Sequence, residues 1–246
     1  MGERLKVSRF ARAGFWLAAP AAVAAVLAGV GSREGWWHFG VGFSILKWAA
    51  YAAVAAAALS AIGVAATRRG RARGRAAAWL GLAAGLVVAG APAVQVWTAG
   101  RVPPIHDIAT DPDHPPVFSA IAPLRGDAAN TIDYGGPAVA AQQRKAYPDL
   151  GPALLDLPPR QAFDAALAVA RDMGWEIVDA NPGQGRIEAT DRTFWFGFKD
   201  DVVIRVAPTE TGSRVDVRSL SRVGRSDVGT NAKRIRAFLA RLHSSR

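Results

Sequence analysis

The chain has no cysteine among its 246 residues. A disulfide framework is therefore excluded, and so are thiolate nucleophiles and thiolate metal sites. The sequence also has no G-x-S-x-G nucleophile elbow, no HExxH zinc motif and no glycine-rich loop of the kind that holds phosphate. These absences argue against the common hydrolases, and no cofactor is expected. The lack of cysteine is compatible with an oxidising compartment but does not require one.

Acidic residues are scarce in the first hundred positions. Residues 1–100 carry eleven Lys and Arg against only Glu3 and Glu34, a net charge of +9, whereas residues 101–246 carry nineteen against eighteen acids, a net charge of +1. A strongly basic protein often binds nucleic acid through phosphate contacts. Here the positive charges flank apolar segments and the other half is nearly neutral, so no nucleic-acid partner is expected.

Three long apolar stretches occupy the same hundred residues, at about 10–30, 41–66 and 76–99. About 20 apolar residues suffice to cross a ~30 Å hydrocarbon core. Buried core helices are the alternative for any single stretch, but three in succession with short connections favour transmembrane helices. Residues 1–100 are therefore predicted to form a membrane domain in contact with the lipid bilayer. The second stretch is rich in alanine, and small side chains predict close packing between the spans.

The charges of the loops predict the orientation. Four cations precede residue 13 and five arginines occupy the second connection, 67–75, whereas the first connection, 31–40, has one arginine beside Glu34. Three crossings place both basic segments on one side, which the positive-inside rule assigns to the cytoplasm. We therefore expect a multi-pass protein of the bacterial inner membrane, with its N-terminus cytoplasmic and its C-terminal domain periplasmic. Cleavage of the first stretch as a signal peptide is the alternative; no A-x-A-type site follows it, and the domain would lie outside either way.

Residues 101–157 are predicted to form an extended arm with a short helix. The segment is rich in Pro, Asp and Gly, and a residue that precedes proline avoids the helical region. Its apolar residues, among them Ile105, Ile108 and Phe118, favour an arm that packs on the domain over a free linker. Residues 137–148 are predicted to form the short helix.

Residues 158–246 have the patterns of an α+β domain. Apolar residues at helical spacing predict a helix over about 158–174 and a C-terminal helix of about 15 residues. Between the two helices, runs rich in β-branched residues bounded by turn residues predict the strands. We therefore expect an antiparallel sheet of four to five strands with helices packed on one face, following three transmembrane helices.

The residue pattern of the last two strands predicts which of their residues lie opposite one another. If the PTETG turn joins them as a hairpin, Ile204 lies opposite Val217 and Arg205 lies opposite Asp216. The apolar pair then occupies one face and the opposite-charge pair the other, as a sheet with one buried face requires.

The aromatic run FWFGF at 194–198 has two interpretations. Alternation along a strand would put Phe194, Phe196 and Phe198 on one face, where they would join the core. The same run could instead be an exposed strip that stacks on a partner or contacts the membrane. The core interpretation is the one expected.

Four segments resemble a known family. They are PPIHDIATDP at 103–112, DYGGPAVAAQQRKAYPDL at 133–150, FWFGFKDDVVIRV at 194–206 and RSLSRVGRSDVGTNAKRI at 218–235. They are similar to the domain of unknown function 1499, and the pattern SRxGxxDxGxNxxRI is the most specific part. The resemblance covers residues 103–242. It implies a domain that several proteobacterial proteins carry behind similar membrane helices, and it transfers no activity.

Charged and small residues gather within 218–235, where the last strand enters the last helix. A helix N-terminus presents free N–H groups and a partial positive charge, so arginines there suit an anion. The alternative is structural: Ser226 or Asp227 caps the helix, and the arginines pair with carboxylates such as Asp200 and Asp201. The candidate ligand-binding residues are Arg218, Ser221, Arg222, Arg225, Asp227, Asn231 and Arg234.

One cluster in the arm has metal-binding residue types. It comprises His106, Asp107, Asp111, Asp113 and His114. Imidazole and carboxylate suit Zn²⁺ or Mn²⁺, but the spacing matches no ligand motif. A polar turn, in which Asp side chains accept from nearby backbone N–H groups, is the alternative and the expected interpretation, so no metal site is predicted.

Together these patterns predict a non-enzymatic binding or interaction module of the cell envelope. Besides the bilayer, its expected partner is an anionic small molecule or an envelope protein. The alternative is an enzyme that acts on an envelope substrate, with its active site around residues 218–235. A deep cavity lined by Arg222, Arg225 and Asp227 would favour a ligand or catalysis, and a flat salt-bridged surface would favour a structural role.

Overall fold

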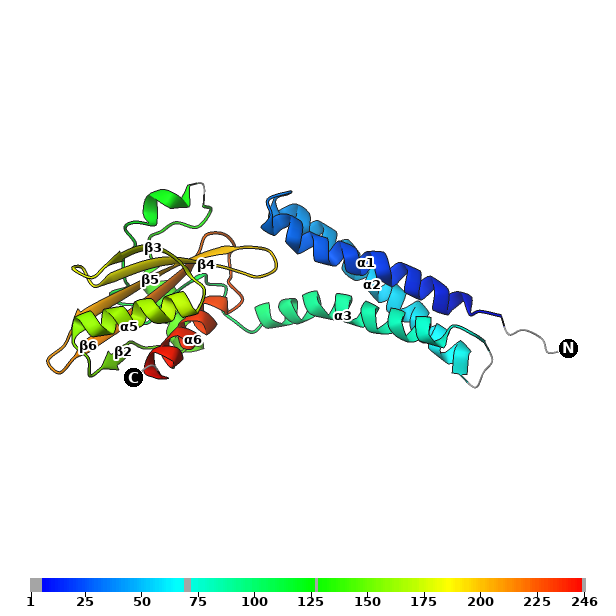
Figure 1. Ribbon diagram of the computed structural model, residues 1–246. Coiled ribbons are helices and arrows are strands. Elements are labelled where there is room, and N and C mark those ends of the chain that lie inside the picture. Colours follow the sequence, from blue (N-terminus) through cyan, green and yellow to red (C-terminus); the bar gives the residue numbers. More distant parts are fainter. Residues whose placement is uncertain (1–5, 69–71, 127, 245–246) are drawn as a thin grey trace. The chain divides into compact units, whose positions relative to one another are not determined.

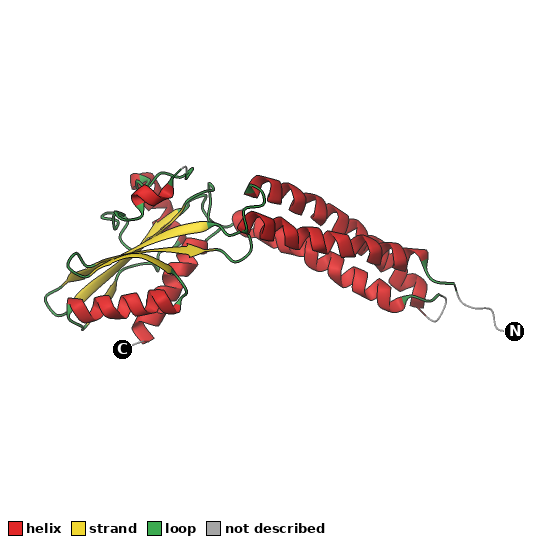
Figure 2. Cartoon of the chain, turned by 45° about the horizontal axis from the view of Figure 1, so that its top comes forward, coloured by secondary structure: helices red, strands yellow, loops and turns green. Residues whose placement is uncertain are grey.

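The chain divides into two compact units. The computed structural model describes residues 6–68, 72–126 and 128–244. One unit comprises Met1–Trp97 with Phe194–Gly197, and the other comprises Thr98–Thr193 with Phe198–Arg246. The first unit is mainly helical, and the second combines a sheet with helices (Figure 1; Figure 2).

Three helices form the first unit: α1 Arg9–Arg33, α2 Phe39–Thr67 and α3 Arg75–Ala99. At 1.5 Å per residue, even the 25-residue helices extend for about 37 Å, which exceeds a hydrocarbon core of about 30 Å. All three are long and apolar enough to cross a membrane. The three predicted spans are thus confirmed as helices.

Small residues let these helices approach one another closely. Ser60 of α2 lies between Gly14 of α1 and Gly81 of α3, and a Cβ at either glycine would meet the Ser60 hydroxyl at 2.2 or 2.4 Å. Ala53 and Ala56 of α2 are fully buried. A larger side chain at either glycine would push the helices apart. The close packing predicted from the alanine-rich second span is confirmed.

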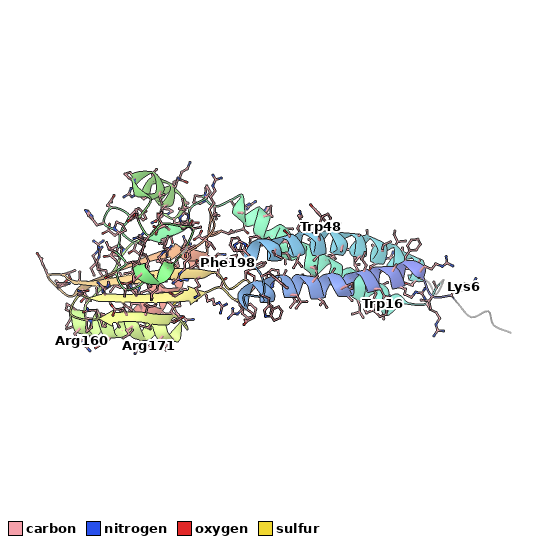
Figure 3. The ribbon with its side chains drawn as sticks, turned by 90° about the horizontal axis from the view of Figure 1, so that it is seen from above. Lys6, Trp16, Trp48, Arg160, Arg171 and Phe198 are labelled. Atoms are coloured by element: carbon pink, nitrogen blue, oxygen red, sulfur yellow. The ribbon has the colours of Figure 1, made fainter. Side chains whose placement is uncertain are left out.

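Large aromatic side chains project away from the helix contacts. Trp16 and Trp48 are 67% and 66% exposed, and Figure 3 shows both pointing out from the helices. Water around so many large apolar side chains would be unfavourable, whereas lipid chains would solvate them. The exposed surface of the first unit is therefore compatible with contact with a lipid bilayer.

The second unit contains an antiparallel sheet of six strands (Figure 1). The strands are β1 Asp107–Ala109, β2 Ala153–Leu155, β3 Glu176–Asn181, β4 Arg186–Arg192, β5 Lys199–Pro208 and β6 Ser213–Ser221. Their order is β1-β6-β5-β4-β3, and β2 also pairs with β6. β1 and β2 therefore share one edge of β6, at 218–220 and 213–215. The predicted α+β class is confirmed. The arm adds two short strands, β1 and β2, which were not predicted because three residues are too few to show an alternating pattern.

The register predicted for the last hairpin is confirmed. Ile204 lies opposite Val217, and Arg205 lies opposite Asp216. The apolar pair is buried against the helices, and the charged pair lies on the other face, where Arg205 donates to Asp216 at 2.9 Å. One buried face was enough to determine this register, because a slip by one residue would exchange the two faces.

Helices cover one face of the sheet. The helices of this unit are α4 Gly136–Ala146, α5 Pro159–Asp172 and α6 Thr230–Ser244, with a short 3-10 helix, η2 Ala122–Arg125. α5 and α6 pack on alternate apolar residues of β4, β5 and β6, and Trp175 stacks on Phe238 of α6 with ring centroids 5.5 Å apart. The core between sheet and helices therefore lies where the sequence predicted it.

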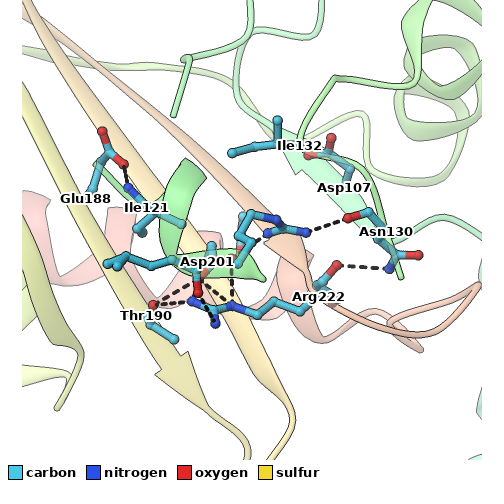
Figure 4. Close-up of polar contacts among 12 residues, drawn as sticks. Asp107, Ile121, Asn130, Ile132, Glu188, Thr190, Asp201 and Arg222 are labelled. Atoms are coloured by element: carbon cyan, nitrogen blue, oxygen red, sulfur yellow. Dashed lines mark hydrogen bonds and ion pairs between the residues drawn. The ribbon is translucent and has the colours of Figure 1, made fainter. Parts of the chain in front are cut away.

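The opposite face of the sheet is more polar and is covered by the arm. Glu188 of β4 is fully buried and accepts hydrogen bonds from three successive backbone N–H groups at 119–121, one of which is drawn in Figure 4. Beside it, Phe118 packs with Val203 and Leu220 in a small apolar cluster. The arm is thus an ordered layer on the sheet.

The aromatic run at 194–198 does not form a strand. The ladder between β4 and β5 closes at the pair Arg192 and Lys199, and the residues between them form a turn. Phe194 is 91% exposed. The interpretation of this run as a strand is wrong, because the aromatics lie beyond the last pair of the ladder. Of the expected core residues, Phe196 is buried, but in the helical unit.

Candidate functional site

Residues 222–229 link β6 to α6 and contain several of the candidate residues. Asp227 caps α6: one carboxylate oxygen accepts from the N–H of Gly229 and the other from the N–H of Asn231, both at 2.8 Å. Burial raises the pKa of Asp227, and these two hydrogen bonds oppose the rise. Gly229 has φ of +80°, a conformation that glycine adopts without a steric cost. The capping role that the structural alternative gave to Asp227 is confirmed.

Asn231 ties the helix to two other segments. It is fully buried, and its amide NH₂ donates to the carbonyl of His106 at 2.9 Å and to the hydroxyl of Ser221 at 3.0 Å. Its side-chain oxygen accepts from the hydroxyl of Ser219 at 2.8 Å and from Arg234. The hydrogen-bonding capacity of this side chain is thereby used in full. Asn231 joins α6, β6 and the arm.

Arg234 lies on the same side of the sheet as Asn231 and is buried. Its guanidinium donates to the carboxylates of Asp191 and Asp200, each at 2.7 Å, and to the hydroxyl of Ser219 at 3.1 Å. Charge-assisted bonds of this kind fix the planar guanidinium in one orientation. The pairing with Asp200 expected in the structural alternative is confirmed.

Arg222 belongs to a second network, drawn in Figure 4. It donates to both oxygens of Asp201 at 2.8 to 3.1 Å. Arg125 of η2 donates to the same carboxylate, and the hydroxyl of Thr190 donates to it at 2.9 Å. Burial lowers the pKa of Arg125, and Asp201 opposes the fall. Two arginines therefore share one fully buried carboxylate, which joins the arm to the sheet.

Arg218 makes the most extensive set of contacts. Only 3% of it is exposed, and it forms a bidentate ion pair with Asp107 of β1 at 2.8 and 2.9 Å. It also donates to the backbone carbonyls of Pro116 and Ile132, and its guanidinium lies 5.1 Å from the ring centroid of Phe118. Burial raises the pKa of Asp107, and the guanidinium of Arg218 opposes that rise. This side chain locks the arm onto β6.

The seven candidate residues do not converge on one site. Successive side chains of a strand point to opposite faces, so Arg218 and Arg222 reach the arm, whereas Ser221 bonds on the side of Arg234. Arg225 is exposed in the loop, and its guanidinium has no ion-pair partner within the described ranges. Ligand binding at this corner stays a prediction, and Arg225 is the residue best placed to meet a ligand there.

The metal candidates lie apart and have other partners. Asp111 accepts from two arginines of β5 and β6, and from the backbone N–H of His114 at 3.0 Å. Asp113 pairs with Arg144 of α4, and the ring of His106 lies 3.4 Å from a carbonyl of the corner loop. Across the part of the chain that the structure describes, no group of three His, Asp or Glu is placed to hold a metal ion.

A cavity of about 440 Å³ lies between the segment that follows β1, the helix α4 and the segment that precedes β2. Its walls come from residues 110–113 after β1, from Gln143, Arg144 and Tyr147 of α4 and its end, and from Pro148 and residues 150–152 before β2. This mixed lining suits a ligand with an apolar body and a polar end.

The sequence did not indicate this cavity. Its residues come from three segments without a motif, and its buried polar group Gln143 serves the backbone: the side chain bonds both the N–H and the carbonyl of Ala109, at 3.0 and 2.6 Å. The prolines at 112, 148 and 152 were the sequence signal that could have indicated the cavity, because proline has no N–H to continue the hydrogen bonding between strands.

Comparison with known proteins assigns the second unit to a family. A family model described as "Protein of unknown function (DUF1499)" matches residues 107–242, which include all six strands, the helices α4 and α5, and most of α6. No curated protein and no solved structure matches the chain. The resemblance noted in the sequence is confirmed. Because the match covers more than half of the chain, the protein belongs to the DUF1499 family.

Proposed function

We propose that the protein is anchored in the bacterial inner membrane by α1 to α3 and holds residues 101–246 in the periplasm as a non-enzymatic binding or interaction module. Three helices able to cross a membrane, directly followed by the family domain, support the anchoring. The observation that carries the binding function is the cavity formed by α4 and the segments next to β1 and β2.

The orientation is supported by the basic residues that flank the helices. Those at the N-terminus and in the α2–α3 connection are Arg4, Lys6, Arg9, Arg12, Arg68, Arg69, Arg71, Arg73 and Arg75. Arg4, Arg69 and Arg71 lie outside the described residues. At the other end of these helices, the only basic residue near the α1–α2 connection is Arg33, the last residue of α1, beside Glu34, so the positive-inside rule places this connection on the far side from the cytoplasm.

Fusions at the C-terminus test this orientation. Alkaline phosphatase fused after the last residue should be active, because it folds only outside the cytoplasm. A fluorescent protein that matures only in the cytoplasm should be dark at the same position. The reverse pair of results would overturn the proposed orientation and the periplasmic placement together.

Binding at the cavity is supported by its rigid and accessible construction. Gln143 and Asp111 are held by hydrogen bonds, so these walls are formed before a partner arrives. Arg144 and Asp113 form an exposed pair at the rim, and such pairs contribute only about 0–1 kcal/mol, so the pair can open at little cost. Arg144 would then meet an anionic group while Tyr147 and Leu150 contact the apolar part of the partner. An anionic small molecule or an acidic segment of an envelope protein fits this lining.

Site-specific crosslinking in cells tests the binding site. A photoreactive amino acid at Arg144 should capture a discrete partner, whereas the same residue at Ala168, which is exposed on α5 away from the cavity, should not. Equal capture at both positions, or capture at Ala168 alone, would contradict binding at this cavity.

The second candidate function is an enzyme with its active site around residues 218–235. The observation that favours it is Val228, the one non-glycine residue with positive φ, +54°, among those described. Strained backbone of this kind often marks a functional site, and the exposed Arg225 lies three residues away. If Arg225→Ala keeps the stability of the protein but abolishes its cellular phenotype, this corner is functional. An unchanged phenotype would contradict an active site at this corner.

A further inference from the structure

The turn between β4 and β5 holds an aromatic side chain that the domain does not bury. Among the described residues, Phe194 is the most exposed of the large apolar side chains, at 91%. Full burial of a Phe side chain contributes about 1.5–3 kcal/mol, so leaving this ring in water forgoes that stabilisation. The sheet does not need the ring, because the β4–β5 ladder closes before the turn. Its position therefore calls for a partner outside the sheet.

The turn is part of the compact unit formed by the membrane helices. That unit includes Phe194–Gly197 together with α1 and α2. Within it, the guanidinium of Arg33 donates to the carbonyl of Phe194 at 2.6 Å, and the indole N–H of Trp195 lies 3.5 Å from the carbonyl of Val26. A Cβ on Gly29 would meet the Trp195 ring at 2.0 Å, so the indole sits directly on the α1 backbone. These contacts fix the turn near the C-terminal end of α1 and leave the Phe194 side chain exposed.

The end of α1 defines a depth in the bilayer. Since α1 extends for about 37 Å and the hydrocarbon core measures about 30 Å, the last turn of a spanning α1 lies at the boundary between acyl chains and headgroups. Trp36 and Trp37 follow directly in the sequence, and tryptophan is enriched at this boundary. A turn bonded to Arg33 is held at the same level.

The chemistry of the turn fits that level. A phenyl ring is stabilised when it leaves water and enters the upper acyl region. Water gives the Phe194 ring no comparable stabilisation. The lipid interface is thus the partner that both the position and the residue types favour.

We propose that the β4–β5 turn is an interfacial membrane anchor, in which the Phe194 ring inserts between the headgroups and the upper acyl chains at the end of α1. The anchor is a lipid contact of the DUF1499 domain itself, in addition to the three spanning helices. It depends on α1 crossing the bilayer and not on which side is the cytoplasm, so it can fail while the proposed orientation and the cavity stand.

The absence of cysteine makes a direct test simple. The full chain with Phe194→Cys is spin-labelled and reconstituted in phospholipid vesicles, and collision rates are measured with oxygen, which dissolves in lipid, and with a water-soluble nickel chelate. The matched control is Glu210→Cys, at the exposed turn between β5 and β6 at the other end of the same sheet. The oxygen-to-nickel ratio at 194 should exceed that at 210 several-fold.

Two outcomes would overturn the anchor. A ratio at 194 equal to that at 210 would mean that the turn lies in water, and a label shielded from both reagents would mean that protein covers it. Should the cysteine variant not fold, a benzophenone amino acid at Phe194 provides a second measurement in the same vesicles. Adducts with lipid support the proposal, and adducts with protein alone refute it.

Discussion

Arg218→Met removes one half of a buried ion pair and leaves the Asp107 carboxylate without its partner. The methionine keeps most of the apolar stem of the arginine but loses the guanidinium that lies over the Phe118 ring. The variant loses both hydrogen bonds to Asp107 and those to the carbonyls of Pro116 and Ile132. Removing one partner of a buried ion pair costs about 3–5 kcal/mol in the free energy of unfolding.

Proton uptake by Asp107 limits this cost and makes it depend on pH. Protonating a carboxyl costs about 1.4 kcal/mol for each pH unit above its ordinary pKa of 3.8. That is about 4 kcal/mol at pH 7 but only about 1.6 kcal/mol at pH 5. Burial raises the pKa of Asp107, and the variant no longer has Arg218 to oppose the rise. Its native state therefore binds this proton more tightly than the unfolded state, so its stability must fall as the pH rises above about 4.

Urea unfolding of a fragment comprising residues 101–246, followed by tryptophan fluorescence, to which the buried Trp175 contributes, measures the effect. We expect Arg218→Met to lower the free energy of unfolding by about 3–5 kcal/mol at pH 7. At pH 5 this loss should be smaller by about 2–3 kcal/mol. The matched control is Arg160→Met, whose exposed pair with Asp164 on α5 predicts a change below about 0.5 kcal/mol (Figure 3 shows Arg160 pointing outward).

The pH dependence identifies the carboxylate as the cause. Adding Asp107→Leu to Arg218→Met should restore part of the stability at pH 7, because no buried charge remains unpaired. The same double variant should show equal losses at pH 5 and pH 7. A loss for Arg218→Met that is the same at both pH values, or no larger than that of Arg160→Met, would refute the reasoning.

Three further predictions follow from the same networks. A fragment that begins at Arg101 should be soluble without detergent and unfold cooperatively, because it has no apolar run long enough to cross a bilayer and its core is complete; aggregation on expression would contradict this. Arg222→Ala should lower the free energy of unfolding by about 1–3 kcal/mol, since it removes charge-assisted bonds to the buried Asp201, whereas Arg225→Ala should change it by less than about 0.5 kcal/mol; equal melting curves would be the contrary result. Val228→Gly should raise the stability by about 1 kcal/mol by relieving φ of +54°, and a lower melting temperature would show that the valine packing outweighs the strain.

Patterns that repeat over many residues made most of the fold predictable. A helix such as α2 has 29 residues in which to show its apolar character. The β5–β6 hairpin could be placed residue by residue, because one face had to be buried and the turn was short. β1 and β2 have three residues each, and nothing in so short a run distinguishes a strand from an extended loop. The aromatic turn misled for a related reason: alternation looks the same in a strand and in the loop that continues it.

The partners of the charged residues could be predicted only where they lie close in sequence. The pairing of arginines with Asp200 and Asp201 was foreseen as an alternative, since those acids open the neighbouring strand. The partner of Arg218 was not, because Asp107 lies 111 residues earlier and no spacing rule connects them. Asp107 was instead grouped with nearby histidines and acids that have other partners.

The dependence of β1 and β2 on β6 also imposes an order on biosynthesis. The chain emerges from the ribosome from its N-terminus, so the arm appears first and the strand that receives it appears last. At roughly 5–20 residues per second, the 111 residues between Asp107 and Arg218 take roughly 5–20 s to make. Until then Ile105 and Ile108 have no β6 to pack near, and the arm is open to any chaperone or protease on its side of the membrane.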